Sequence, residues 1–384
     1  MTFDTPRSAR AAAACGLVVV FVSTMFVGGR HEGVSADTPS EAAALAATDR
    51  TSTSRVYHNR LTPIENPEPL LADYPEFVQP VIENRRFEAP PLIEEPGADL
   101  SVRAWRFSYN ARGIIEVPNH IRADRTAVIM VHPWGIDDGQ GWRTPEPAGV
   151  ADFCTVEKNH LAGRHTAEVI NPLLKRLRER VNLVLYSMRG GEHPAHKAVY
   201  RSVRHRPGAK ERERGIKELH RVLADFDYRG KPLPAELTIS DERSFQDYFR
   251  QFPGIDAGPR YNNAGFWNLP TPVCSDVDVH PDDVVYYDTD GYAGLKGFLK
   301  EQGVKHVILT GYATDMCFCA TTAGYEHLSK DFNVFLVGDA TLATFPANNS
   351  PRYATNAHIS YASLNQFVTQ CSWIELEQKQ SGGR

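Results

Sequence analysis

The stretch HVILTGYATDMCFCATTAGYEHL, residues 306–328, decides the fold class. Residues 306–309 are apolar and predict a buried strand, and a glycine-containing turn leads to Cys317, where we expect a helix running to Leu328. Backbone N–H groups at a helix start favour a thiolate, lowering a cysteine pKa that begins near 8.5, and they also stabilise an oxyanion. The alternative is that Cys317 is a small buried core residue, which is the interpretation we prefer for Cys319.

Outward from this stretch, strands and helices alternate along the chain. Strands are expected at 101–110, 114–121, 126–132, 182–186, 283–287, 306–309 and 333–337, and helices at 164–180, around Leu295 and Leu299, and at 317–328. Short apolar strands separated by helices of this kind predict right-handed βαβ units. The sequence is therefore that of an α/β protein with a mainly parallel sheet covered on both faces.

Composition excludes several classes of protein. The chain has 384 residues, 42% of them hydrophobic, a net charge of −5 and six cysteines. The charge gives no basic footprint for nucleic acid, and the cysteines are too few for a disulfide scaffold. The basic stretch 201–217 is interleaved with glutamates, which favours a solvated helix, although an anion-attracting surface or a variable lid is the alternative.

The chain divides into an export segment, a linker and a body. Residues 1–36 have the form of a signal peptide: basic residues, the uncharged run 11–29 and a small-residue cleavage site. An uncleaved signal anchor is the alternative, because that run approaches the length needed to span a bilayer. Residues 37–100 are rich in proline and are expected to form a linker or extension with few regular elements. The body is expected over 101–376, with an insertion around 200–280 and a tail at 377–384. The body is thus predicted to be periplasmic or extracellular.

The segment from Gly311 to Cys317, GYATDMC, resembles the isochorismatase-like family of cysteine hydrolases, which includes nicotinamidases and N-carbamoyl amidases. Thr321, Ala323 and Gly324, and the sequence VGDA at 337–340, extend the resemblance. It implies a three-layer α/β/α sandwich with a Rossmann-like sheet, a homo-oligomer, a small-molecule substrate and no required cofactor. It also implies a cis peptide bond, not preceding proline, around residues 312–314.

Two catalytic positions of that family are occupied differently here. His132 stands after the strand 126–131, where the family has its aspartate, and a histidine is a suitable base for a thiol. Asp137 is the alternative base. No lysine follows the strand at 283–287, where the family has one, and Tyr287, Asp288 and Asp290 are the polar residues offered instead. Ordinary strand-end and turn chemistry would equally account for these residues.

The sequence GEHPAH at 191–196 resembles the metal segment of nicotinamidases. The family's first aspartate is replaced by glycine, and the second histidine is one position early. His193 and His196 remain candidate zinc ligands, with solvated histidines as the plainer alternative.

These observations support three functions, the third of which is a metal-dependent hydrolase centred on His193 and His196. The first is an exported cysteine hydrolase acting on a C–N bond of a small amide-like molecule. Cys317 attacks, His132 or Asp137 takes its proton, and the N–H groups of Ala313 and Cys317 hold the oxyanion, with Thr314 in the same loop as a further candidate. The second is a binding or assembly module that keeps the fold and has lost the family's aspartate and lysine.

Overall fold

The computed structural model describes residues 55–133, 156–225, 240–242, 270, 272–274, 276–314, 317–343 and 370–376. They belong to one compact unit that begins at Tyr57, apart from the two residues before it. Within these described ranges, no helix is both long enough and apolar enough to cross a bilayer. Asp137, the predicted export segment and the tail lie outside the described residues.

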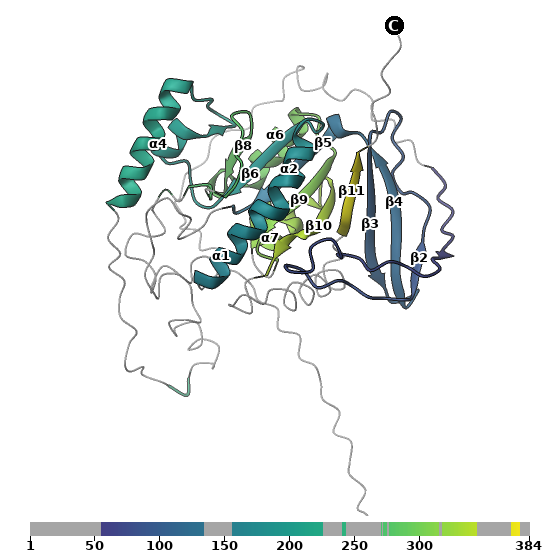
Figure 1. The fold of residues 1–384 in the computed structure, drawn as a ribbon. Helices are drawn as coiled ribbons and strands as arrows, with labels where there is room; N and C mark the ends of the chain where they lie inside the picture. Colours follow the sequence, from purple (N-terminus) through teal and green to yellow (C-terminus); the bar gives the residue numbers. More distant parts are fainter. Residues whose placement is uncertain are drawn as a thin grey trace, which may run out of the picture. The chain divides into compact units, whose positions relative to one another are not determined.

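The predicted α/β fold with a mainly parallel sheet is confirmed (Figure 1). The six central strands run in the order β10-β9-β5-β6-β8-β7, and each is parallel to its neighbour. Their bounds are β5 Thr126–Val131, β6 Leu183–Met188, β7 Arg201–Ser202, β8 Val284–Tyr287, β9 His306–Tyr312 and β10 Asn333–Leu342. Strand β11, Gln370–Leu376, pairs in parallel with β10 and joins these strands to an antiparallel hairpin.

Alternate residues of the central strands point to opposite faces, which produces three layers. Val128 and Met130 of β5 pack in one apolar core and Ile129 of β5 in the other. The first core is covered by α1 Val156–His165, a π-helical turn, Thr166–Ile170, α2 Asn171–Arg178, α3 Pro194–Val199 and α4 Ala209–Ala224. The second is covered by α6 Gly291–Glu301, α7 Cys317–Ala320 and α8 Tyr325–Leu328. Both faces of the sheet are therefore buried, as uninterrupted apolar strands require.

The segment before Ser101 is part of the folded unit. Strands β3 Leu100–Ser108 and β4 Gly113–Ile121 form the expected hairpin, and the short strands β1 Thr62–Pro63 and β2 Arg86–Glu88 extend the sheet beyond β4. Between them, Leu71 and Phe77 are almost fully buried. The prolines keep regular elements short, as expected, but the apolar residues between them anchor the segment to the core.

The prediction of one continuous helix from Cys317 to Leu328 is wrong. The chain forms two single-turn helices, α7 and α8, separated by a turn over 321–324. A Cβ at Gly324 would lie 2.7 Å from the carbonyl oxygen of Cys319, so the chain folds back tightly there. The hydroxyls of Thr321 and Thr322 bond to Asp288 across the site, which draws this turn out of helical register.

Candidate active site

Three side chains from the carboxyl ends of parallel strands meet at one edge of the sheet. His132 directly follows β5, Cys317 follows β9 after a short loop, and Asp288 directly follows β8. In open α/β sheets this edge is where ligands bind. These three residues are far apart in the sequence. They come together because the strands that precede them lie close in the sheet, in the order β9-β5-β6-β8.

His132 lies at the centre of this group. Its Nε2 is 3.0 Å from Oδ2 of Asp288, and its ring also hydrogen-bonds the side chain of Cys317. The imidazole is buried, with 8% of its surface exposed, whereas Asp288 is 23% exposed and Cys317 is half-buried. A thiol, an imidazole and a carboxylate in contact are the parts of a nucleophile, its proton acceptor and an orienting group.

Charge in the site favours a protonated His132. Burial by itself lowers the pKa of this imidazole, but hydrogen bonds to Asp288 and Cys317, and their negative charges, outweigh burial and raise it to about 9. At neutral pH the ring therefore carries a proton between two potential anions. The protonated ring places a proton donor beside the side chain of Cys317.

The backbone of His132 is in the left-handed region, with φ of 46°. Non-glycine residues adopt this conformation rarely, and at a cost, unless surrounding contacts hold them there. Here the His132 N–H donates to the carbonyl oxygen of Ser187 at 2.9 Å, on the neighbouring strand β6. This turn directs the imidazole toward Asp288 rather than onward along the strand.

Two threonines that the sequence did not indicate as site residues hold the carboxylate. Thr321 donates its hydroxyl to Oδ2 of Asp288 at 3.0 Å, and its oxygen lies 3.3 Å from Nε2 of His132. The Thr322 hydroxyl donates to the backbone carbonyl of Asp288 at 3.1 Å. In the sequence, the only indication that these threonines contact Asp288 is that two hydroxyl side chains follow the cysteine turn, and this indication is weak.

Ala313 and Thr314, the described residues between β9 and Cys317, are buried and held by backbone hydrogen bonds. The bond between Tyr312 and Ala313 is cis, as the resemblance implied. The Thr314 N–H donates to the carbonyl of Leu342 at 3.0 Å, so it is already engaged within the protein. The Ala313 carbonyl accepts from the Phe318 N–H, which ties the loop to α7. Ala313 and Cys317, rather than Thr314, remain the candidate oxyanion donors.

Tyr287 is directed away from this group. Its ring stacks on His196 with centroids 5.7 Å apart, and burial raises its pKa, with further contributions from the charges of Glu192 and Tyr200. Among the described residues it has no hydrogen bond to Cys317 or His132. Of the three polar residues offered at the end of β8, the structure brings Asp288 into the site, leaves Tyr287 in the core and pairs Asp290 with Arg204.

The geometry gives no support to the candidate zinc ligands. Nδ1 of His193 accepts the N–H of Ala195 as the cap of α3, and His196 is buried against Tyr287. Within the described ranges, no group of three histidine, cysteine, aspartate or glutamate side chains gathers as a metal site would require. We therefore do not propose a metal site at His193 and His196.

Fold and site together define an α/β protein with a cysteine–histidine–aspartate group at the carboxyl edge of a parallel sheet. The family model of the isochorismatase domain matches residues 273–366, which include Asp288 and Cys317. No curated protein matches the chain.

Solved structures of similar fold are distant in sequence. A cysteine hydrolase from Pseudomonas syringae pv. phaseolicola is 18% identical, with 63% of this chain and 85% of that chain covered and a TM-score of 0.33. A nicotinamidase from Bacillus subtilis is 13% identical, with coverages of 65% and 99% and a TM-score of 0.32. An isochorismatase-like hydrolase from Alkaliphilus metalliredigens is 11% identical, with coverages of 64% and 93% and a TM-score of 0.32.

The family-model match shows an isochorismatase domain over residues 273–366, the stretch that holds the cysteine turn described above. His132 and Asp288 stand where the resemblance would place an aspartate and a lysine.

Proposed function

We propose that this protein is a cysteine hydrolase that cleaves a C–N bond of a small amide-like molecule, with Cys317 as nucleophile, His132 as its acid–base partner and Asp288 as the orienting carboxylate. The observation that carries the proposal is the contact of His132 with both Cys317 and Asp288. His132 and Asp288 thus occupy the strand-end positions where the resemblance places an aspartate and a lysine. Together they supply a proton acceptor for the thiol and a carboxylate that orients it.

The first half of the reaction forms a thioester. The Cys317 thiolate adds to the carbonyl carbon, and the developing oxyanion is held by the N–H groups of Ala313 and Cys317. Protonated His132 then donates its proton to the departing nitrogen, so the C–N bond breaks and an amine leaves. Asp288 stabilises the imidazolium before this transfer and fixes the orientation of the ring throughout.

The second half restores the enzyme. Neutral His132 accepts a proton from a water molecule, whose oxygen adds to the thioester carbon. The C–S bond breaks, the product leaves as a carboxylic acid and Cys317 returns to the thiolate beside protonated His132. No metal or organic cofactor is required by these steps.

Export and assembly belong to the proposal as well. Basic residues Arg7 and Arg10 before the uncharged run 11–29 support an exported protein, anchored in the membrane if that run is retained. Determining the amino-terminal residue of the protein isolated from its native cell tests this, with Asp37 expected after cleavage. The family resemblance supports a homo-oligomer, which sedimentation measurements would reveal.

The experiment that tests the catalytic proposal is hydrolysis of a panel of small amides, ureides and N-carbamoyl compounds by the full chain. We expect at least one to be turned over, with acyl-enzyme trapped on Cys317 and detected by peptide mass spectrometry. Cys317→Ser and His132→Ala should abolish turnover, and Asp288→Asn should reduce kcat by about 10²-fold or more.

Asp290→Asn is the matched control, since Asp290 lies two residues further on and pairs with Arg204 instead. It should retain the wild-type rate. Turnover that survives Cys317→Ser, or that falls equally in Asp288→Asn and Asp290→Asn, would refute the proposed roles. A folded protein that hydrolyses nothing in the panel and leaves Cys317 unacylated would favour the alternative, a non-catalytic binding module.

A further inference from the structure

A cavity of about 570 Å³ lies between α4 and the segment 273–283. Its charged end lies away from the Cys317 site: Asp283, on the wall, precedes β8, whereas Asp288 follows that strand. At about 3.3 Å per residue, the two ends of this stretch are about 16 Å apart. The other end of the wall comes nearer, since the Cys274 N–H donates to the carbonyl oxygen of Pro133, which follows His132. The volume is in the range that accommodates a small organic ligand.

The cavity has an apolar lining from both sides. Ile216 is 40% exposed, one of the few large apolar side chains of the described residues that are open to solvent. It shares the lining with other aliphatic residues, Val199, Leu219, Val273, Val277 and Val279. An open aliphatic surface inside a cavity favours an apolar ligand group.

Two guanidinium groups on the same cavity have no carboxylate partner among the described residues. Arg201 donates to the carbonyl oxygen of Asp282 at 2.6 Å, and Nε of Arg212 donates to the carbonyl oxygen of Val199 at 3.1 Å. Burial lowers the pKa of Arg201, and the charge of nearby Arg206 lowers it further, whereas the charge of Asp283, which makes no ion pair with Arg201, raises it. Both arginines remain cationic, because the guanidinium pKa is far above neutrality.

Their neighbours are neutralised. Arg204 pairs with Asp290, and Arg206 pairs with Asp282. Asp283, the carboxylate that lines the cavity, is bonded by Arg178 at 2.9 Å and by the hydroxyl of Tyr186 at 2.8 Å. The lining therefore carries positive charge that the described residues leave without a carboxylate.

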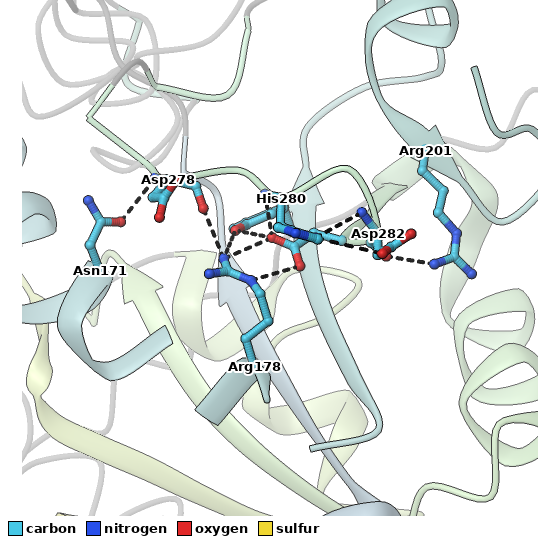
Figure 2. Close-up of polar contacts among 8 residues, drawn as sticks. Asn171, Arg178, Arg201, Asp278, His280 and Asp282 are labelled. Carbon is cyan, nitrogen blue, oxygen red and sulfur yellow. Dashed lines mark hydrogen bonds and ion pairs between the residues drawn. The ribbon is translucent and has the colours of Figure 1, made fainter. Parts of the chain in front are cut away.

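The wall opposite α4 is held in place by side chains from the sheet and from α2 (Figure 2). Asn171 brackets the segment, donating to the carbonyl of Asp276 and accepting the N–H of Asp278. Arg178 bonds the carbonyl of Asp278, and Arg201 bonds the carbonyl of Asp282. A wall fixed at this many points is formed before a ligand arrives, which reduces the ordering cost of binding.

We propose that this cavity is a second ligand site, which binds a small organic anion with an apolar body, such as an aliphatic or aromatic carboxylate. Arg201 and Arg212 hold the anionic head through charge-assisted hydrogen bonds, and Ile216, Leu219 and the valines enclose the body. The site does not depend on the chemistry at Cys317.

Isothermal titration of the full chain with sodium octanoate tests this, with octylammonium chloride as the probe of equal length and opposite charge. We expect octanoate to bind at one site and octylammonium to bind about tenfold more weakly or not at all. Arg201→Met and Arg212→Met keep much of the apolar stem and remove the charge, and each should weaken octanoate binding about tenfold or more. Arg214→Met, on the same helix but outside the cavity, is the matched control and should leave it unchanged.

Cys274, a free cysteine, lines the cavity, so the alkylation is done in a Cys274→Ser chain. That chain, alkylated at Cys317 with iodoacetamide, should bind octanoate as the unalkylated Cys274→Ser chain does. Loss of binding on alkylation would assign the octanoate to the catalytic site and overturn the proposal. Absence of octanoate binding at millimolar concentration, equal binding of octylammonium, or binding unaffected by both cavity arginine variants would overturn it as well. None of these results bears on whether the Cys317 site hydrolyses amides.

Discussion

At the scale of single residues, the site depends on the imidazole of His132. Its ring is buried, which disfavours a charge, yet it is in contact with a carboxylate and a cysteine that favour one. The left-handed backbone at this position costs stability, which the contacts of the folded state must offset. Such a combination of strain and an opposed electrostatic environment is typical of functional sites.

The titration of His132 is the corresponding prediction. NMR of the chain labelled at histidine Cε1 should show one ring titrating at about pH 9, identified by its absence in His132→Gln. Asp288→Asn removes a charge that raises this pKa, so the midpoint should move down. The raised pKa also means that the protonated ring contributes stability that is fully present below about pH 6.5 and lost as the pH rises through 9.

Asp290→Asn, which removes a carboxylate outside the hydrogen-bonded group, should leave the His132 midpoint in place. A midpoint near the ordinary histidine value in the wild-type chain would contradict the ion pair. An unchanged midpoint in Asp288→Asn would show that another charge is responsible.

The residues of the candidate site were predictable to the extent that they follow strands. Cys317 and His132 stand at the ends of motifs that are visible in the sequence, and Asp288 was one of three polar residues expected at the end of β8. Nothing in the sequence showed whether Asp288 or Tyr287 would enter the site. The answer depends on the direction in which each side chain points at the end of β8. Thr321 enters the site only because the helix breaks there, a consequence of tertiary contacts.

At the scale of elements, the turn from β9 to the cysteine depends on close approach to β5. Gly311 has φ of 102°, a conformation reserved for glycine, and a Cβ added to it would overlap the backbone of Val131. Val131 is the residue before His132. The same glycine therefore sets the spacing between the strands that carry the histidine and the cysteine.

Gly311→Ala should consequently destabilise the protein by roughly 2–4 kcal/mol, and reduce iodoacetamide labelling of Cys317 in its native environment, because both strands must separate. Gly297→Ala in α6 is the control, since no atom lies within 4 Å of its added Cβ. It should be neutral or stabilise by up to about 1 kcal/mol, as alanine does within a helix. Urea unfolding followed by circular dichroism measures both, and equal effects would contradict the close approach.

The central sheet was predictable because apolar strands buried on both faces have a strong sequence signal. The break between α7 and α8 was not, since Ala, Thr and Tyr there are compatible with a helix and only the contacts to Asp288 exclude one. Residues 37–100 were expected to form a linker or an extension with few regular elements. Periodicity did not mark their buried side chains, because isolated residues such as Phe77 anchor them rather than a continuous apolar face.

At the scale of the whole molecule, this early segment closes the sheet at the edge beyond β4. Glu116 of β4 is 1% exposed and lies between Arg86 and Arg103, which are its ion-pair partners. Arg86 comes from β2, and Leu71 packs against Gly338 of β10. Without the segment, a buried carboxylate would lose one of its two cations, and the outer edge of β4 would be unpaired.

Removal of residues 1–56 should therefore leave the melting temperature unchanged, because the compact unit begins at Tyr57. Removal of residues 1–99 should lower it by about 10 °C or more, or cause aggregation, since the loss of Phe77 alone costs about 3–5 kcal/mol. Differential scanning calorimetry of the three chains measures this. Phe77→Ala in the full chain should fall between the two deletions, which separates lost packing from the lost edge strand. Equal melting temperatures for the chains beginning at Tyr57 and at Leu100 would show that the segment is an appendage, and that the hairpin β3–β4 closes the sheet without it.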